Sequence, residues 1–353
     1  MIEETLKEID INGDMTDEEK SSDEDVDIIE NEVISYVGNY SLREYYEKFN
    51  SNFIKPHFQR NEVWSVQTKS KLIESFLASY PVPPVILYKL KGVEQYWIID
   101  GLQRISTIKE YFENEFNLII KNEQYRGKKF KDLSKDAQNK LNNTFLNCII
   151  VREISPQGDV FLYNLFERLN TGSTALNAME VRRAISYGPL IKNLEELNKN
   201  VSWRKIIGKN EVDNRFLDVE LLLRILAIYT NFNITTKSVD NYIGMKSFLN
   251  LFTNENKDKI FEYFNQKFEK TCEEIVEQLG ELPFTLNGKK INYILLDSVM
   301  NALLYKQDLS DIKKKYYTYK SSDAFSIYND KSGTTSKVKV NTRMKSAFEA
   351  FNE

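Results

Sequence analysis

A carboxylate, a glycine and an arginine lie close together in the segment Asp100-Gly101-Leu102-Gln103-Arg104. An arginine can bind two phosphoryl oxygens at once, and an aspartate can hold a divalent cation or orient a water molecule. The glycine lets a ligand approach the backbone closely because it carries no side chain. These residue types in one short segment indicate a site for a phosphorylated ligand and a metal ion.

The residues on either side predict the elements that would position this segment. Residues 95–99 are aromatic and β-branched, which favours a strand, and helical spacing follows at Ile105, Ile108, Tyr111 and Phe112. A helix that begins at about Leu102 would present free N–H groups and the positive end of its dipole beside Asp100. An ordinary Asp-Gly turn, with the aspartate as helix cap, gives the same local pattern. The pattern alone leaves both interpretations open.

Two other segments also carry polar side chains that suit a phosphate ligand. The first, residues 56–65, is followed by a helical pattern and by the proline-rich residues 80–84. The second is residues 166–184. The candidate ligand-binding side chains in these two segments are Gln59, Arg60, Arg168, Asn170 and Thr171.

Taken in order, the three segments resemble the N-terminal domain of GmrSD-type restriction endonucleases, a family with a ParB/sulfiredoxin-like core. The family pattern is F-Q-R and a tryptophan, then P-x-P-P, D-G-Q-Q-R, an R-x-N-T-G loop and an E-x-R helix. Here Leu102 replaces the first glutamine of D-G-Q-Q-R. Any contact that this glutamine makes in the family is therefore lost in this chain. A further likeness at residues 215–224 extends the resemblance to about Tyr229.

The resemblance implies a nucleotide site with Mg²⁺. Arg104 and the amides after Gly101 would hold a triphosphate, and Asp100 would bind the metal or orient water. Arg60 would close on the ligand from its own segment. Gln59 and Gln103 would position it, and a second wall would come from Arg168, Asn170 and Thr171. Pocket shape decides the base, and no motif in this sequence specifies it.

Several of these residues also have an ordinary structural interpretation. Arg60 can pair with a glutamate, Glu62 or Glu74, and the tryptophan that follows it can belong to the core. Glu180 of the E-x-R helix can pair with Arg183 on its own helix.

Two functions from different classes follow. The first is an NTP-binding and NTP-hydrolysing regulatory component of a modification-dependent restriction or anti-phage defence system, which acts on DNA with a separate nuclease. The second is a non-catalytic ParB-like module that binds DNA or a nucleotide. A carboxylate beside an anion site favours turnover. A nuclease activity of this chain alone ranks third, because no second carboxylate cluster accompanies Asp100 and the chain has only one histidine. The sequence has no P-loop motif, so nucleotide hydrolysis would have to use the Asp100 turn.

Composition and periodicity predict an α+β protein, a small ParB/sulfiredoxin-like mixed α/β domain followed by a mainly helical one. We expect an acidic disordered tail over residues 1–32, the α/β domain over 33–155 and the helical domain over 156–353. The strands are expected at 85–89, 95–100 and 145–152, between helices at 67–79, 102–112 and 134–141. No apolar run is long enough to cross a membrane, so we expect a cytoplasmic protein.

Charge is unevenly distributed along the chain. Residues 1–32 hold 14 acidic and 2 basic side chains, a net of −12, which leaves +8 on the rest of a chain whose net charge is −4. The tail is either a solvating extension or a mask over a basic surface. Residues 321–339 and the helix that follows them are basic, which indicates a solvated face or a contact with nucleic acid, through Lys331, Lys337, Lys339, Arg343 and Lys345. The two cysteines, Cys148 and Cys272, are expected in the core.

Overall fold

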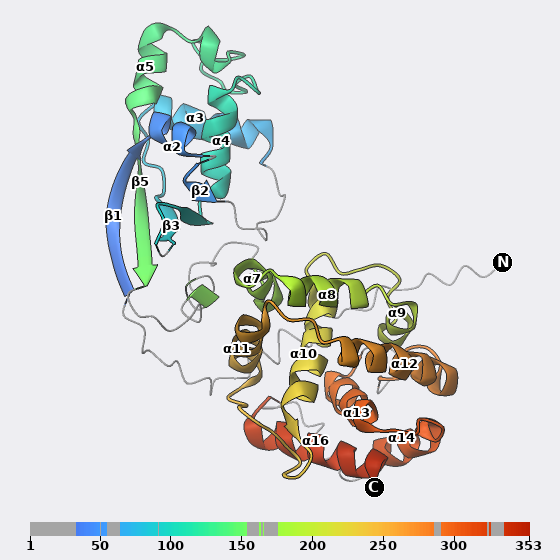
Figure 1. Ribbon diagram of the computed structural model, residues 1–353. Coiled ribbons are helices and arrows are strands. Elements are labelled where there is room, and N and C mark those ends of the chain that lie inside the picture. Colours follow the sequence, from blue (N-terminus) through green and yellow to red (C-terminus); the bar gives the residue numbers. More distant parts are fainter. Residues whose placement is uncertain are drawn as a thin grey trace, which may run out of the picture. The chain divides into compact units, whose positions relative to one another are not determined.

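The computed structural model describes residues 33–49, 51–54, 64–90, 92–153, 162–163, 165, 176–285, 291–322, 325 and 335–353. It confirms the α+β class, because strands gather in one part of the chain and helices dominate the other (Figure 1). Contacts within the chain define two compact units, Ile28–Leu176 and one that contains Asn177–Glu353. The predicted tail and the predicted domain boundary at residue 155 lie outside the described residues.

A mixed sheet is the framework of the α/β unit. Its strands follow the order β1-β5-β3-β4-β2, and their bounds are Val33–Ser41 for β1, Phe53–Ile54 for β2, Val85–Lys89 for β3, Tyr96–Asp100 for β4 and Phe145–Glu153 for β5. β3 runs parallel to β5 and antiparallel to β4, while β1 runs antiparallel to β5. The sequence predicted β3, β4 and β5 and missed β1 and β2, whose pairing partners lie far along the chain.

Helices pack against this sheet (Figure 1) and bury its apolar side chains. They are α2 Leu42–Lys48, α3 Val66–Leu77, α4 Leu102–Phe112 and α5 Lys135–Asn143. Ser41 caps α2 through a capping box with Glu44. In α4, Ile105, Ile108 and Tyr111 are fully buried, which places the predicted apolar stripe of this helix in the core.

Both cysteines are core residues, as predicted. Cys148 on β5 is fully buried, and its burial raises the pKa of its thiol. Burial raises the pKa of Cys272 in the helical unit in the same way. Neutral buried thiols of this kind are poor metal ligands and poor nucleophiles.

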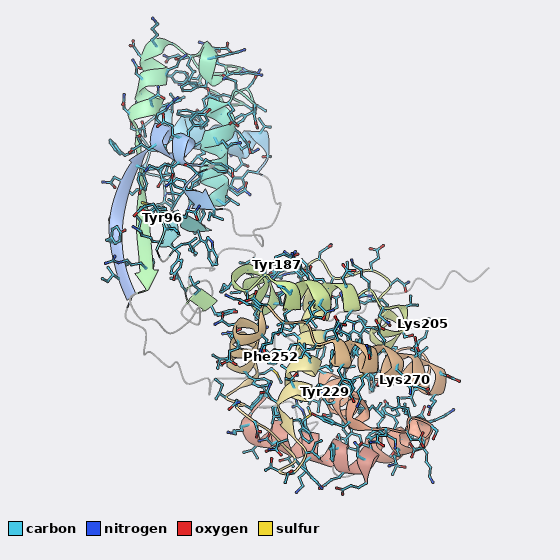
Figure 2. The ribbon with its side chains drawn as sticks, in the orientation of Figure 1. Tyr96, Tyr187, Lys205, Tyr229, Phe252 and Lys270 are labelled. Atoms are coloured by element: carbon cyan, nitrogen blue, oxygen red, sulfur yellow. The ribbon has the colours of Figure 1, made fainter. Side chains whose placement is uncertain are left out.

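The helical unit packs around two almost entirely buried helices, α10 Leu217–Asn231 and α13 Tyr293–Tyr305. Side chains fill the space between its helices (Figure 2). The surrounding elements are α7 Ala178–Ile185, α8 Pro189–Leu197, α9 Val201–Ile207, β6 Phe232–Asn233, β7 Ser238–Val239, α11 Met245–Asn256, α12 Glu262–Leu279, α14 Ile312–Lys320 and α16 Lys337–Asn352. No helix in the described ranges combines the length and apolarity needed to cross a bilayer.

Arg343 does not lie on a solvated basic face, and this corrects an expectation from the sequence. Its side chain on α16 is 1% exposed, and its Nη2 donates to Oδ2 of Asp297 on α13 at 2.8 Å. Nη2 of Arg224 on α10 donates to the same oxygen at 3.0 Å. This buried carboxylate therefore joins α10, α13 and α16.

Candidate functional site

The strand-turn-helix around Asp100 forms as the sequence predicted. Asp100 is the last residue of β4, and α4 begins at Leu102 with Gly101 at its N-cap. The N-cap residue is Gly101, which has no side chain to cap the helix, so Asp100 is not the helix cap of the ordinary-turn interpretation. The positive end of the helix dipole favours an anion at this N-terminus.

Gly101 is required by both its backbone conformation and its surroundings. Its φ of +96° lies in the left-handed region that side chains disfavour. A Cβ built at this position would lie 2.4 Å from Cγ1 of Val85 on β3 and 3.0 Å from Nη2 of Arg104. The glycine therefore lets β3, β4 and the start of α4 meet closely.

We expect Gly101→Ala to destabilise the protein by about 2 to 3 kcal/mol, from backbone strain and overpacking against Val85. Gly92→Ala is the matched control, because Gly92 also has a positive φ of +77° but its added Cβ would have no neighbour within 4 Å. Urea unfolding of both variants separates the two effects. An equal loss in the two variants would show that the contact with Val85 contributes nothing.

Arg104 turns back from the first turn of α4 to the end of β4. Its Nη2 donates to Oδ2 of Asp100 at 2.7 Å and to the carbonyl oxygen of Pro84 at 3.2 Å. Its Nε is buried and has no hydrogen-bond partner among the described residues. The side chain of Asp100 is 52% exposed and that of Arg104 is 14% exposed. The pair therefore presents an accessible carboxylate beside a guanidinium with unused donor capacity.

Gln103 and Leu102 make contacts within the fold. Oε1 of Gln103 accepts a hydrogen bond from the backbone N–H of Trp64 at 3.2 Å, which connects α4 to the residues that lead into α3. Leu102, which stands where the family pattern has glutamine, is 7% exposed and belongs to the core of the α/β unit. Trp64 packs against the edge of that core, in line with its structural interpretation.

The other predicted ligand-binding residues cannot be placed beside Asp100. Gln59, Arg60, Arg168, Asn170 and Thr171 lie outside the described residues. The structure therefore brings together Asp100, Gly101, Gln103 and Arg104 from the predicted set. It adds the Pro84 carbonyl and Val85, which the sequence analysis did not assign to the site.

The E-x-R helix has a structural role in the helical unit. Asn177 and Glu180 form a capping box at the start of α7, and Oε2 of Glu180 pairs with Nη2 of Arg215 at 3.0 Å. Arg183 pairs with Glu195 on α8 at 2.6 Å. These partners come from other elements, which a search along one helix does not reveal.

The donor set suits a cation that arrives with a ligand. The described residues contain no group of three or more histidine, cysteine, aspartate or glutamate side chains suited to a metal. Mg²⁺ commonly binds through one or two carboxylates, while substrate phosphates and water complete its shell. Asp100, as a single accessible carboxylate beside Arg104 and the N-terminus of α4, fits that mode of binding.

Residues 42–187 match the model of one protein family, described as the N-terminal domain of GmrSD restriction endonucleases. The match includes β3, β4 and the Asp100 turn and ends just beyond α7. Searches of curated proteins and of solved structures found no match.

Proposed function

We propose that this protein is a regulatory component of a modification-dependent restriction or anti-phage defence system, because residues 42–187 match the model of the GmrSD restriction endonuclease N-terminal domain. In this proposal the protein binds and hydrolyses an NTP with Mg²⁺, and it acts on DNA together with a separate nuclease. The family supports the restriction role. The geometry of the Asp100 turn supports the nucleotide chemistry.

One observation carries the nucleotide proposal: the N-terminus of α4 and the guanidinium of Arg104 lie at the same turn. Phosphate oxygens there would accept hydrogen bonds from the first amides of α4 and from Arg104. An anion at this position would therefore give the buried Nε of Arg104, which lacks a partner in the described part of the chain, a hydrogen-bond acceptor.

Asp100 supplies the second half of the proposed chemistry. Its carboxylate would hold Mg²⁺ or orient the water that attacks the terminal phosphate. The ion pair with Arg104 keeps this carboxylate at the turn before a ligand binds. A triphosphate with its cation matches the pair, because it brings negative charge to Arg104 and positive charge to Asp100.

We expect Arg104→Ala to weaken NTP binding by about 1.5 to 3 kcal/mol, the usual contribution of a charge-assisted hydrogen bond. Isothermal titration calorimetry in the presence of Mg²⁺ measures this loss. The control is Arg43→Ala. Arg43 on α2 also forms an i,i+4 ion pair, with Glu47. Unchanged affinity of the Arg104 variant would make the residue a structural link between α4 and Pro84.

The second candidate is a ParB-like module that binds a nucleotide or DNA without turnover. The direct ion pair between Asp100 and Arg104 favours this candidate, because the pair can hold the turn together without any role in catalysis. Phosphate release from each of the four NTPs, with Mg²⁺ and with or without DNA, separates the two candidates. Release above that of the Asp100→Ala protein supports turnover, and binding without release supports the module.

A further inference from the structure

The connection between α4 and α5 carries the positive charge of the α/β unit. We call residues 118–140 the basic arm, which leads into α5 and includes that helix as far as Lys140, at the top of Figure 1. The arm holds seven basic and three acidic side chains, a net charge of +4, whereas the rest of residues 33–176 has a net charge of zero. Its basic residues are Lys121, Arg126, Lys128, Lys129, Lys131, Lys135 and Lys140.

Backbone hydrogen bonds close the arm on itself. The N–H of Gly127 donates to the carbonyl of Leu118 at 2.8 Å, and the N–H of Leu118 donates to the carbonyl of Lys128 at 3.1 Å. The ring of Phe130 stacks on Phe112 of α4 with a centroid distance of 4.5 Å. The arm is thus fastened to the core of the unit and is not a loose loop.

Hydrogen bonds from two side chains fix the backbone in the middle of the arm. Oδ1 of Asn114 accepts a hydrogen bond from the N–H of Lys131 at 2.8 Å. Nε2 of Gln138 on α5 donates to the carbonyls of Phe130, Lys131 and Leu133 at 3.1 to 3.3 Å. The basic side chains therefore project from a fixed backbone, which lowers the entropy lost when they bind a partner.

The cations of the arm form no ion pair in the described part of the chain, whereas several other cations of the unit do. All seven are exposed or half-exposed. Elsewhere in the unit Lys69 pairs with Glu110 at 2.5 Å and Lys109 with Glu113 at 3.0 Å. Like charges held together repel each other, and a polyanion relieves that repulsion.

We propose that the basic arm binds the phosphate backbone of duplex DNA without reading its sequence. This inference rests on the proposed function only in taking DNA as the partner, and it does not depend on nucleotide binding at Asp100. Seven cations along one segment exceed what a single small anion needs. They suit a duplex, whose phosphates give a regular line of negative charge. The arm would thus supply affinity while specificity lies elsewhere.

The test compares full-length variants by fluorescence anisotropy with a labelled duplex over a salt series. Neutralising three arm lysines together, Lys128→Gln, Lys131→Gln and Lys135→Gln, should weaken binding about 10- to 100-fold and lower the slope of log Kd against log salt by about 2 to 3. A triple variant on the helical unit, of equal net charge, is the matched control. Its positions are Lys205 and Lys270, both labelled in Figure 2, and Lys313.

A triple arginine variant at the same arm positions keeps the charge and should bind DNA like the original protein. NTP binding and melting temperature should be unchanged in every variant, which separates loss of the arm from loss of the fold or of the nucleotide site. Three outcomes would each overturn the proposal: equal losses of DNA affinity in the arm and control variants, no loss in the arm variant, or no DNA binding by the original protein at low salt.

Discussion

Asp100→Ala should lower NTP turnover by about 100- to 10,000-fold, the usual contribution of a group that positions or deprotonates the attacking water. The change removes the carboxylate that would hold Mg²⁺ or that water. It also breaks the ion pair with Arg104, but Asp100 is 52% exposed, and exposed pairs contribute about 0 to 1 kcal/mol to stability. The protein should stay folded, so phosphate release reports on the chemistry.

Glu94→Ala is the matched control for Asp100→Ala. Glu94 lies just before β4 and forms an exposed ion pair with Lys89 at 2.6 Å, and its side chain is 72% exposed. Its removal should leave turnover unchanged. Equal rates for the original protein and the Asp100 variant would remove the catalytic role from Asp100 and leave the binding module as the better account.

Asp297→Ala should destabilise the helical unit by about 3 to 5 kcal/mol, because it takes away the carboxylate between two buried arginines. Asp297 is 2% exposed, and its Oδ2 accepts from Arg224 and Arg343, which are 4% and 1% exposed. In the variant, two guanidinium charges would stay buried without the carboxylate of Asp297. Urea unfolding measures the loss, and faster hydrogen exchange should appear in α10, α13 and α16.

Asp240→Ala provides the comparison for Asp297, since Asp240 is exposed and its side chain accepts a 3.3 Å hydrogen bond from Asn233. A surface change of this kind should stay within about 0.5 kcal/mol. The strands β3 and β5 should keep their exchange protection in both variants. A similar small effect at Asp297 would mean that the arginines reach other acceptors or water at little cost.

Local pattern alone predicted the elements of the candidate site. Aromatic and β-branched residues before Asp100 indicated β4, and apolar spacing after it indicated a helix that begins at Leu102, as observed. These features were readable because strand and helix periodicities act within a few residues. The type of residue at positions 100 to 104 likewise indicated an anion site before any geometry was known.

The sequence by itself thus determined the α+β class, the strand-turn-helix and the residue types at the turn. Tertiary structure alone decided the contacts between distant residues. β1 forms because Val33 faces Glu153 and Ser41 faces Phe145 on β5. Arg343, which looked like part of a solvated basic face, is buried because Asp297 lies 46 residues away in sequence but 2.8 Å away in space. Periodicity reports which side of an element is apolar, whereas the partner of a charge depends on how the whole chain packs.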